Sequence, residues 1–213
     1  MSWLSWDKLC EPKANGGMGF QQLKQFNLAL LAKQGCRLQV MHDSLVYRLF
    51  KARYFPHTDF VHASGNRPSY AWRSIMAAQH VVKQGIRWNV GNGEHIRVWG
   101  DKWLPSPSTF KVVSPRLFMH ADTRVSKLIS HELVGWKMQV IDTLFLPHEA
   151  DIIKSIPLST HSPPDKLIWA ATTNGLFSVR SAYRLAMEAS RFDTTGSNSD
   201  GSGLRKFWRQ IWS

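Results

Sequence analysis

The stretch GIRWNVGNGEHIRVWGDKW, residues 85–103, decides how this 213-residue chain is expected to fold. Apolar and polar residues alternate on both sides of Gly91-Asn92-Gly93, a pattern that is typical of a β-hairpin with a tight turn. A three-residue loop with Gly93 in the left-handed conformation places the apolar side chains of both strands on one face, whereas a two-residue loop mixes the faces. The stretch therefore predicts a hairpin in which Trp88 lies opposite Ile96.

The polar face of this predicted hairpin carries positive charge. Arg87 stands directly opposite Arg97, beside Asn89 and His95, and like charges in opposed positions repel each other. Two explanations of this arrangement remain open. Either both guanidinium groups hold a nucleic-acid phosphate with the help of Asn89, or a nearby carboxylate such as Asp101 neutralises the arginines.

Around the hairpin, apolar residues mostly recur at helical spacing. Ser178 is expected to cap the last of the predicted helices. A second hairpin is predicted where residues 167–173 turn at Asn174-Gly175 into residues 176–179. The chain is therefore expected to be an α+β protein, mostly helical with two β-hairpins and irregular connections. The helices are predicted at residues 21–41, 44–54, 69–83, 125–130, 147–155 and 178–187.

The predicted domain organisation follows from the prolines and from one run of small polar residues. Residues 1–190 form one region, in which prolines at positions 105, 107 and 115 place a boundary between two subdomains near residues 105–123. Residues 191–203 are predicted to be a flexible linker, because they include the run TTGSNSDGSG. Residues 204–213 start a new amphipathic element, interpreted as the truncated beginning of a further module.

Lysine and arginine outnumber acidic residues by 27 to 15, which gives a net charge of +12 and favours a polyanionic partner. The excess is regional: residues 12–42 contain no acidic residue, and residues 61–100 contain Glu94 alone. Tryptophans at positions 72, 88, 99 and 103 accompany the second basic block, as expected of a protein that stacks on bases. The alternative is that the tryptophans lie in the core and the basic residues on a solvated face. The residues predicted to contact nucleic acid are Arg73, Lys83, Arg87, Asn89, His95 and Arg97.

No catalytic residue, metal ligand or cofactor site is predicted. Phosphoryl transfer needs carboxylates grouped around Mg²⁺, but the acidic residues are scattered singly along the chain. Glu149 and Asp151 fall in the first turn of a predicted helix, where negative charge favours the helix dipole. His57 and His62 flank Asp59 at a spacing that fits a surface loop better than a metal site.

The cysteine content and the hydropathy pattern indicate the compartment. Cys10 and Cys36 lack the C-x-x-C spacing of a zinc site, and two cysteines fit a reducing, intracellular compartment, the nucleus included. No stretch reaches the roughly 20 apolar residues that a membrane span needs, so no membrane partner is expected.

Five motifs in this sequence resemble, in their order and spacing, the C-terminal part of plant LINE-type (non-LTR) retrotransposon reverse transcriptases. The resemblance covers nearly the whole chain. Cys36 departs from it, because the family is expected to carry an aromatic residue at that position. The motifs are WLSWDKLCEPKANGGMGF (residues 3–20), FNLALLAKQGCRL (26–38), AWRSI (71–75), IRWNVGNGEHIRVWGDKWLP (86–105) and GLFSVRSAYRL (175–185).

This resemblance implies that residues 1–190 are a connector that follows the polymerase and runs into the zinc-binding module of the reverse transcriptase. The polymerase aspartates would lie before Met1 and the metal ligands beyond Ser213. The chain is then a non-catalytic fragment that contacts template or primer nucleic acid, whether RNA, DNA or a hybrid, with the flanking modules as its other partners. The alternatives are a structural spacer without binding of its own and a decayed retroelement remnant.

Overall fold

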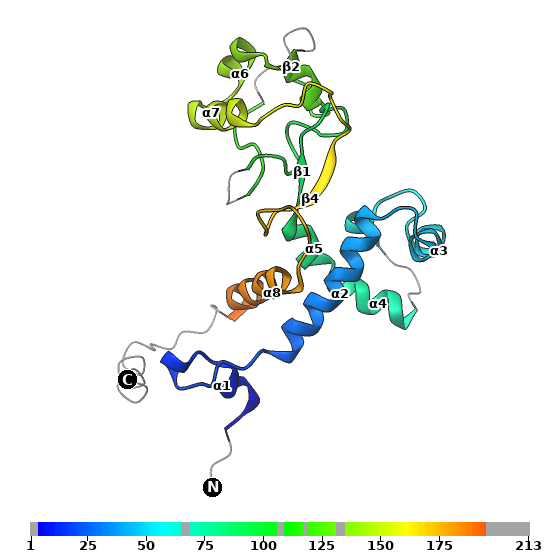
Figure 1. Cartoon of the computed structure of the whole chain (residues 1–213), viewed down its shortest axis with the longest axis vertical. Helices are drawn as coiled ribbons and strands as arrows, with labels where there is room; N and C mark the ends of the chain where they lie inside the picture. Colours follow the sequence, from blue (N-terminus) through cyan, green and yellow to red (C-terminus); the bar gives the residue numbers. More distant parts are fainter. Residues whose placement is uncertain (1–3, 65–68, 106–108, 117–118, 131–134, 195–213) are drawn as a thin grey trace. The chain divides into compact units, whose positions relative to one another are not determined.

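The computed structural model describes residues 4–64, 69–105, 109–116, 119–130 and 135–194, with side chains described up to Ser190 in the last helix. The chain divides into two compact units, and Figure 1 labels their elements. Unit 1 consists of Met1–Gln84 together with Phe177–Ser213, and unit 2 consists of Gly85–Leu176.

Unit 1 is helical, and α2 (Leu23–Val40) is the element on which α4 (Tyr70–Ala77) and α8 (Val179–Thr194) pack. The Tyr183 hydroxyl of α8 accepts a hydrogen bond from the Gln22 backbone N–H at 3.0 Å. The ring of Tyr183 also meets Phe26 edge-on, with 6.4 Å between the centroids. The remaining elements of unit 1 are α1 (Trp6–Cys10), η1 (Lys13–Asn15), α3 (Leu45–Tyr54), η2 (Phe60–His62) and α5 (Gln79–Gly85).

An aromatic cluster around Trp72 forms the core of unit 1 beside α2. Trp72 is fully buried, and the Tyr54 ring stacks on it with 4.6 Å between the centroids and 3° between the planes. Phe60 lies 5.9 Å from Trp72 in an edge-on contact. The absence of a side chain at Gly35 makes room for the Phe60 ring, because a β-carbon at Gly35 would lie 2.6 Å from that ring. The missing side chain on α2 is therefore required by packing.

The structure confirms the helices predicted at residues 21–41, 44–54 and 147–155, which depend on local signals. Ser44 caps α3 by accepting a hydrogen bond from the Tyr47 backbone N–H at 3.1 Å. Ser178 caps α8 in the same way, accepting from the Ser181 N–H at 3.2 Å. At residues 125–130, where one helix is predicted, the chain forms only η3 (Val125–Leu128) and then enters a strand.

The single helix predicted at residues 69–83 is wrong, because the chain turns at the buried Ala78 between α4 and α5. The side-chain amide of Gln79 donates hydrogen bonds to the carbonyl oxygens of Phe60 and Ala63 at 2.8 and 2.9 Å. These bonds satisfy the backbone carbonyls of the first residue of η2 and of its C-cap, and they favour a break in the helix. Helical periodicity cannot show them, since their acceptors lie 16 and 19 residues away.

The described residues of unit 2 form two small antiparallel sheets, two α-helices and η3. β1 (Ile86–Asn89) pairs with β4 (Lys166–Trp169), and β2 (Ile129–Ser130) pairs with β3 (Gly135–Trp136). The helices are α6 (Met138–Leu144) and α7 (Pro147–Ser155). Together with helical unit 1, these sheets confirm the α+β class.

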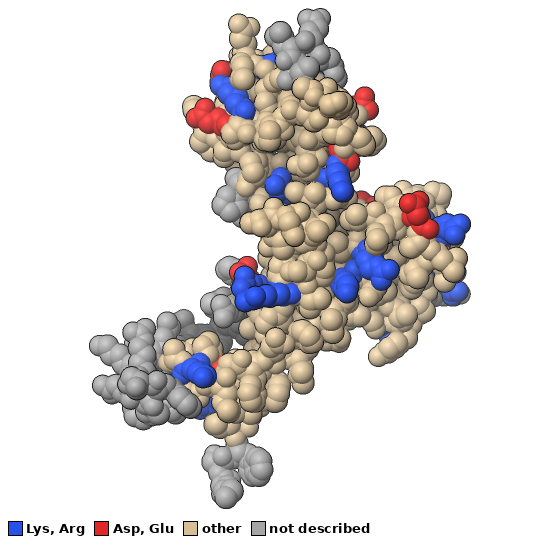
Figure 2. Space-filling view, in the orientation of Figure 1, with Lys and Arg blue, Asp and Glu red and all other residues tan. Residues whose placement is uncertain are grey.

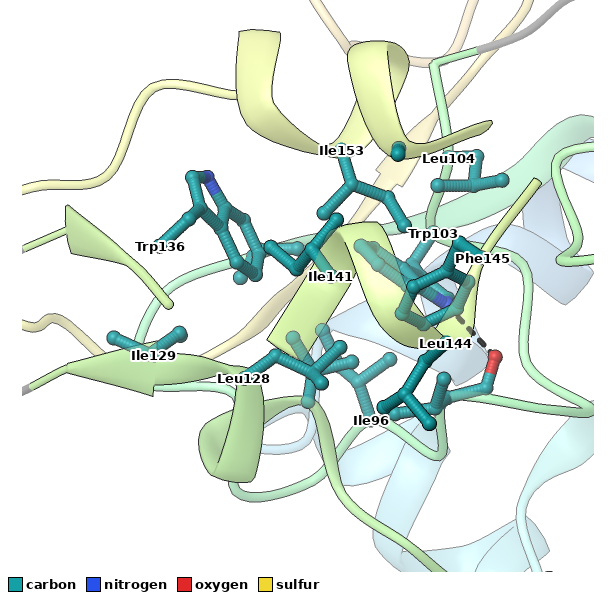
Figure 3. Packing of buried hydrophobic residues seen from close by; sticks show 14 residues of the cluster. Ile96, Trp103, Leu104, Leu128, Ile129, Trp136, Ile141, Leu144, Phe145 and Ile153 are labelled. Carbon is teal, nitrogen blue, oxygen red and sulfur yellow. Dashed lines mark hydrogen bonds between the residues drawn. The ribbon is translucent and has the colours of Figure 1, made fainter. Parts of the chain in front are cut away.

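Residues from distant segments build the core of unit 2 (Figure 3). Trp103 is fully buried, stacks on Trp136 at 6.2 Å and donates its indole N–H to the Val98 carbonyl oxygen at 3.0 Å. Ile141 of α6 and Ile153 of α7 are also fully buried in this cluster. Burial of this kind contributes about 1.5–3 kcal/mol for each large apolar side chain.

The hairpin predicted at residues 85–103 is wrong. β1 is indeed a strand, but its partner is β4, so Trp88 lies opposite Leu167 rather than Ile96. The reason is Asp165, whose fully buried carboxylate accepts hydrogen bonds from the backbone N–H groups of Gly91, Gly93 and His95 at 2.8–2.9 Å. Residues 91–95 wrap around this carboxylate and cannot lie along β1.

The second predicted hairpin is also wrong beyond its first strand. β4 forms as expected, and Gly175 adopts a left-handed conformation with a φ of 70°. The residues after Gly175 do not form a strand, because Thr172 donates its hydroxyl to the Leu176 carbonyl oxygen at 2.8 Å and closes a local turn. The edge of β4 is instead paired with β1.

Along the chain, the two units change over between Gln84 and Gly85 and between Leu176 and Phe177. Residues 105–123, near which a boundary was expected, lie within unit 2. Of the predicted linker, residues 191–194 continue α8, whereas residues 195–203 and the predicted new element at residues 204–213 lie outside the described residues. In the part of the chain that is described, no helix is both long enough and apolar enough to cross a membrane.

Replacing Asp165 with alanine should lower the free energy of unfolding of unit 2 by about 4 kcal/mol, because three amides lose a charged acceptor. Asp165→Asn should cost less, about 2 kcal/mol, since its amide oxygen still accepts. Urea unfolding followed by tryptophan fluorescence measures both. Asp151→Ala, at an exposed carboxylate, is the control, and an Asp165→Ala variant as stable as this control would contradict the role of Asp165.

Candidate nucleic-acid interface

The six residues predicted to contact nucleic acid are divided between the two units. Arg73 on α4 and Lys83 on α5 belong to unit 1, whereas the other four belong to unit 2. Within unit 2, Arg87 and Asn89 lie on β1, His95 ends the segment of residues 91–95 that binds Asp165, and Arg97 lies two residues further along. The prediction therefore has to be examined one segment at a time.

Arg87 and Asn89 alternate with Trp88 on β1 and so share one face of the strand. Their partners on β4 are Ile168 and Lys166, so Arg87 does not stand opposite Arg97, and that prediction is wrong. Arg87 is half-buried and donates to the Trp88 carbonyl oxygen at 3.4 Å. Burial lowers the pKa of Arg87 from its ordinary value.

Arg97 is held by Asp101, as one of the two open explanations proposed. The Asp101 carboxylate accepts from the Arg97 backbone N–H at 2.8 Å and from the guanidinium at 3.0 and 3.3 Å. Hydrogen bonding and charge attraction from Asp101 raise the pKa of Arg97. Much of the charge of Arg97 is therefore balanced inside the protein.

The basic neighbour of Arg97 is Arg124, which the sequence reasoning missed. The two residues form an isolated antiparallel bridge, and the Arg124 guanidinium donates to the His95 carbonyl oxygen at 2.9 Å. The His95 ring is exposed, with its Nδ1 4.0 Å from the Asp165 carboxylate. No local signal in the sequence could have identified Arg124, because a pairing across 27 positions depends on the folded chain.

Four helices of unit 1, namely α2, α3, α4 and α5, carry lysine and arginine residues but no acidic residue. Lys33 and Arg37 lie four residues apart on α2, where like charges destabilise a helix by a few tenths of a kcal/mol. Figure 2 shows separate basic side chains over α2 and α3 on the face that it presents. The eight basic residues are Lys24, Lys33, Arg37, Arg48, Lys51, Arg53, Arg73 and Lys83, all of them exposed except the half-buried Lys51.

The tryptophans belong to the core, as the alternative prediction proposed. Trp72 and Trp103 are fully buried, and Trp88 and Trp99 are half-buried against the core of unit 2. Trp99 stacks on Phe145 at 5.8 Å and donates its indole N–H to the Ser114 carbonyl oxygen at 2.9 Å. These four rings are therefore not a platform for nucleic-acid bases.

Two of the carboxylates singled out in the sequence, Glu149 and Asp59, make structural contacts. Glu149 is buried and accepts hydrogen bonds from the backbone N–H groups of Val113 and Ser114 at 2.7 and 2.9 Å, and from the Ser114 hydroxyl. Asp59 accepts from the His62 backbone N–H at 3.0 Å and caps η2. Among the residues that the structure describes, no three His, Cys, Asp or Glu side chains gather as metal ligands would.

Comparison with known proteins gives two relatives in Arabidopsis thaliana. The first is the "Uncharacterized mitochondrial protein AtMg00310", 45% identical over 106 residues, which are 49% of this chain and 69% of the relative. The chain belongs to the family of that protein. The second is the "Putative ribonuclease H protein At1g65750", 30% identical over 189 residues. These are 85% of this chain but 30% of the relative, so the chain spans less than a third of that longer protein.

The two relatives agree with a retrotransposon-related plant protein, which is the broader part of the resemblance seen in the sequence. No family model matches the chain, and no solved structure matches it.

The Cys36 thiol should make the stability depend on pH. Burial raises the pKa of Cys36 from 9.0 to about 11. Below pH 9 the Cys36 thiol is neutral in both the folded and the unfolded chain. Between pH 9 and about 11 only the unfolded chain ionises, so the free energy of unfolding falls as the pH rises, by about 2 kcal/mol at pH 10.5. Unfolding at pH 8 and 10.5 should show this loss in the native chain and a smaller one in Cys36→Ala. An identical loss of stability in the native chain and in Cys36→Ala would show that Cys36 is not the cause of the pH dependence.

Proposed function

We propose that this chain is a retroelement-derived, non-catalytic region that binds nucleic acid through the basic helices α2–α5. The observation that carries the proposal is the charge of these helices, which contain eight lysine and arginine residues and no acidic residue. Seven of the eight side chains are exposed. Such a surface attracts phosphates and gains free energy by releasing their counterions.

The proposal includes all six predicted contact residues, which are expected to contribute unequally to phosphate binding. Arg73 and Lys83 lie on the basic helices, and Arg87 with Asn89 and Arg97 with His95 form two smaller basic segments in unit 2. Because Asp101 balances Arg97, that segment contributes less to phosphate binding. In the parent protein, the proposed partners are template or primer nucleic acid and the flanking polymerase and zinc-binding modules of a LINE-type reverse transcriptase.

The absence of catalysis is part of the proposal, and the engagement of the carboxylates supports it. Asp165 holds three backbone amides, Glu149 holds two, and Asp101 holds Arg97. Phosphoryl transfer uses carboxylates grouped around Mg²⁺, whereas these three carboxylates bind backbone amides or an arginine.

A structural spacer is the second candidate. The burial of the tryptophans and the pairing of Arg97 with Asp101 favour it, because both give structural roles to residues that the sequence assigned to binding.

The double variant Lys33→Gln/Arg37→Gln should weaken binding to single-stranded RNA and reduce the slope of log K against log salt by about 1.4, since two phosphate contacts are lost. Fluorescence anisotropy over a series of salt concentrations measures the slope. Arg97→Gln should reduce it by much less.

The matched control is Lys137→Gln/Lys154→Gln, which removes two charges from unit 2; Lys154 is paired with Asp142. A native chain that binds no RNA at low salt would reject the proposed function and favour the spacer. Equal slopes for the α2 variant and the control would reject α2 as the contact surface.

A further inference from the structure

The most exposed aromatic side chain in the described residues stands among cations. Tyr70 is the first residue of α4 and is 86% exposed. Arg73 follows one turn later and is also exposed, and residues three apart lie on the same face of a helix. An exposed ring beside a guanidinium group has the composition of a surface that stacks on a base while holding its phosphate.

A second ring and cation lie next to this pair. Ser69, which precedes Tyr70, donates its backbone N–H to the Tyr54 hydroxyl at 3.2 Å, so the end of α3 meets the start of α4. The Arg53 guanidinium lies over the Tyr54 ring, 5.6 Å from its centroid. Tyr54 is itself stacked on the buried Trp72, which fixes the ring in place.

Acidic residues are scarce around this group. Between residues 44 and 93 the only one is Asp59, whose carboxylate accepts from the His62 N–H at 3.0 Å and from the Gln39 side-chain amide at 3.3 Å. Neither α3 nor α4 therefore supplies a carboxylate to balance Arg53 or Arg73.

Resting on the proposed function, we infer that the junction of α3 and α4 binds an unpaired nucleotide of a single-stranded nucleic acid. Tyr70 stacks on the base, and Arg73 and Arg53 hold the neighbouring phosphates. Stacking needs an accessible base face, which a duplex presents only at its ends. The site therefore distinguishes single strands from duplexes, whereas the cations of α2 act on both.

The test is anisotropy with fluorescein-labelled RNA of about 12 nucleotides, as a single strand and as a blunt duplex, and with single-stranded DNA of the same sequence. Tyr70→Ala should weaken binding to both single strands by between about 5-fold and 100-fold. Binding to the duplex should change less than about two-fold. Tyr70→Phe, which keeps the ring, should bind as the native chain does.

Two further variants separate stacking from charge and from general apolar contact. Arg73→Gln should reduce the salt slope for single strands by about 0.7, whereas Tyr70→Ala should leave the slope unchanged. Leu45→Ala, at a 74% exposed apolar residue of α3, is the matched control and should have no effect.

The inference is overturned if the native chain binds single strands and Tyr70→Ala binds them equally well, or if this variant weakens duplex binding to the same extent. Because Tyr70 is almost fully exposed, its replacement does not threaten the fold, and circular dichroism confirms this for each variant. A native chain that binds none of the probes at low salt overturns the proposed function itself, and the inference with it.

Discussion

The buried carboxylate of Asp165 determines the architecture of unit 2. A charged group without solvent must be satisfied by hydrogen bonds, and three backbone amides of the segment from Gly91 to His95 supply them. Since Asp165 directly precedes β4, this contact brings β4 beside β1. Glycine is needed in the segment, because a β-carbon at Gly91 would lie 2.1 Å from the Pro163 carbonyl oxygen. The pairing of β1 with β4 brings the two ends of unit 2 together. The hydrophobic core around Trp103 lies within the same unit.

The same contact explains why the first hairpin could not be predicted, whereas the helices with local signals could. Caps such as Ser44 and Ser178 act on amides three residues away, so the sequence shows them directly. The turn signal at Gly91-Asn92-Gly93 is real, but it does not specify which strand follows. That choice depends on an acceptor 70 to 74 residues further along the chain. The break at Ala78 has a similar origin, because Gln79 is satisfied by carbonyls on another element.

For the candidate interface, too, features visible in the sequence could be predicted, whereas contacts between distant residues could not. A count of charges finds the acid-poor stretches at residues 12–42 and 61–100, which contain α2, α4 and α5, because a missing residue type is visible without a structure. Pairings need the fold: Arg97 meets Asp101 and Arg124, and Tyr54 meets Ser69. The tryptophans are the instructive case, since their enrichment resembles a base-stacking surface although Trp72 and Trp103 lie in the cores and Trp88 and Trp99 pack against the core of unit 2. The most exposed aromatic residue in the described part of the chain is a tyrosine, Tyr70, which composition alone did not distinguish.

The central claim is that the acid-free helices of unit 1 contact nucleic acid. Lysine acetylation with and without single-stranded RNA, read by mass spectrometry at each lysine, tests it most directly. The account predicts that RNA protects Lys24, Lys33 and Lys83 on α2 and α5, while Lys127 and Lys137 of unit 2 are acetylated equally in both samples. Protection confined to unit 2, or no protection at any lysine when RNA is bound in excess, would contradict the account.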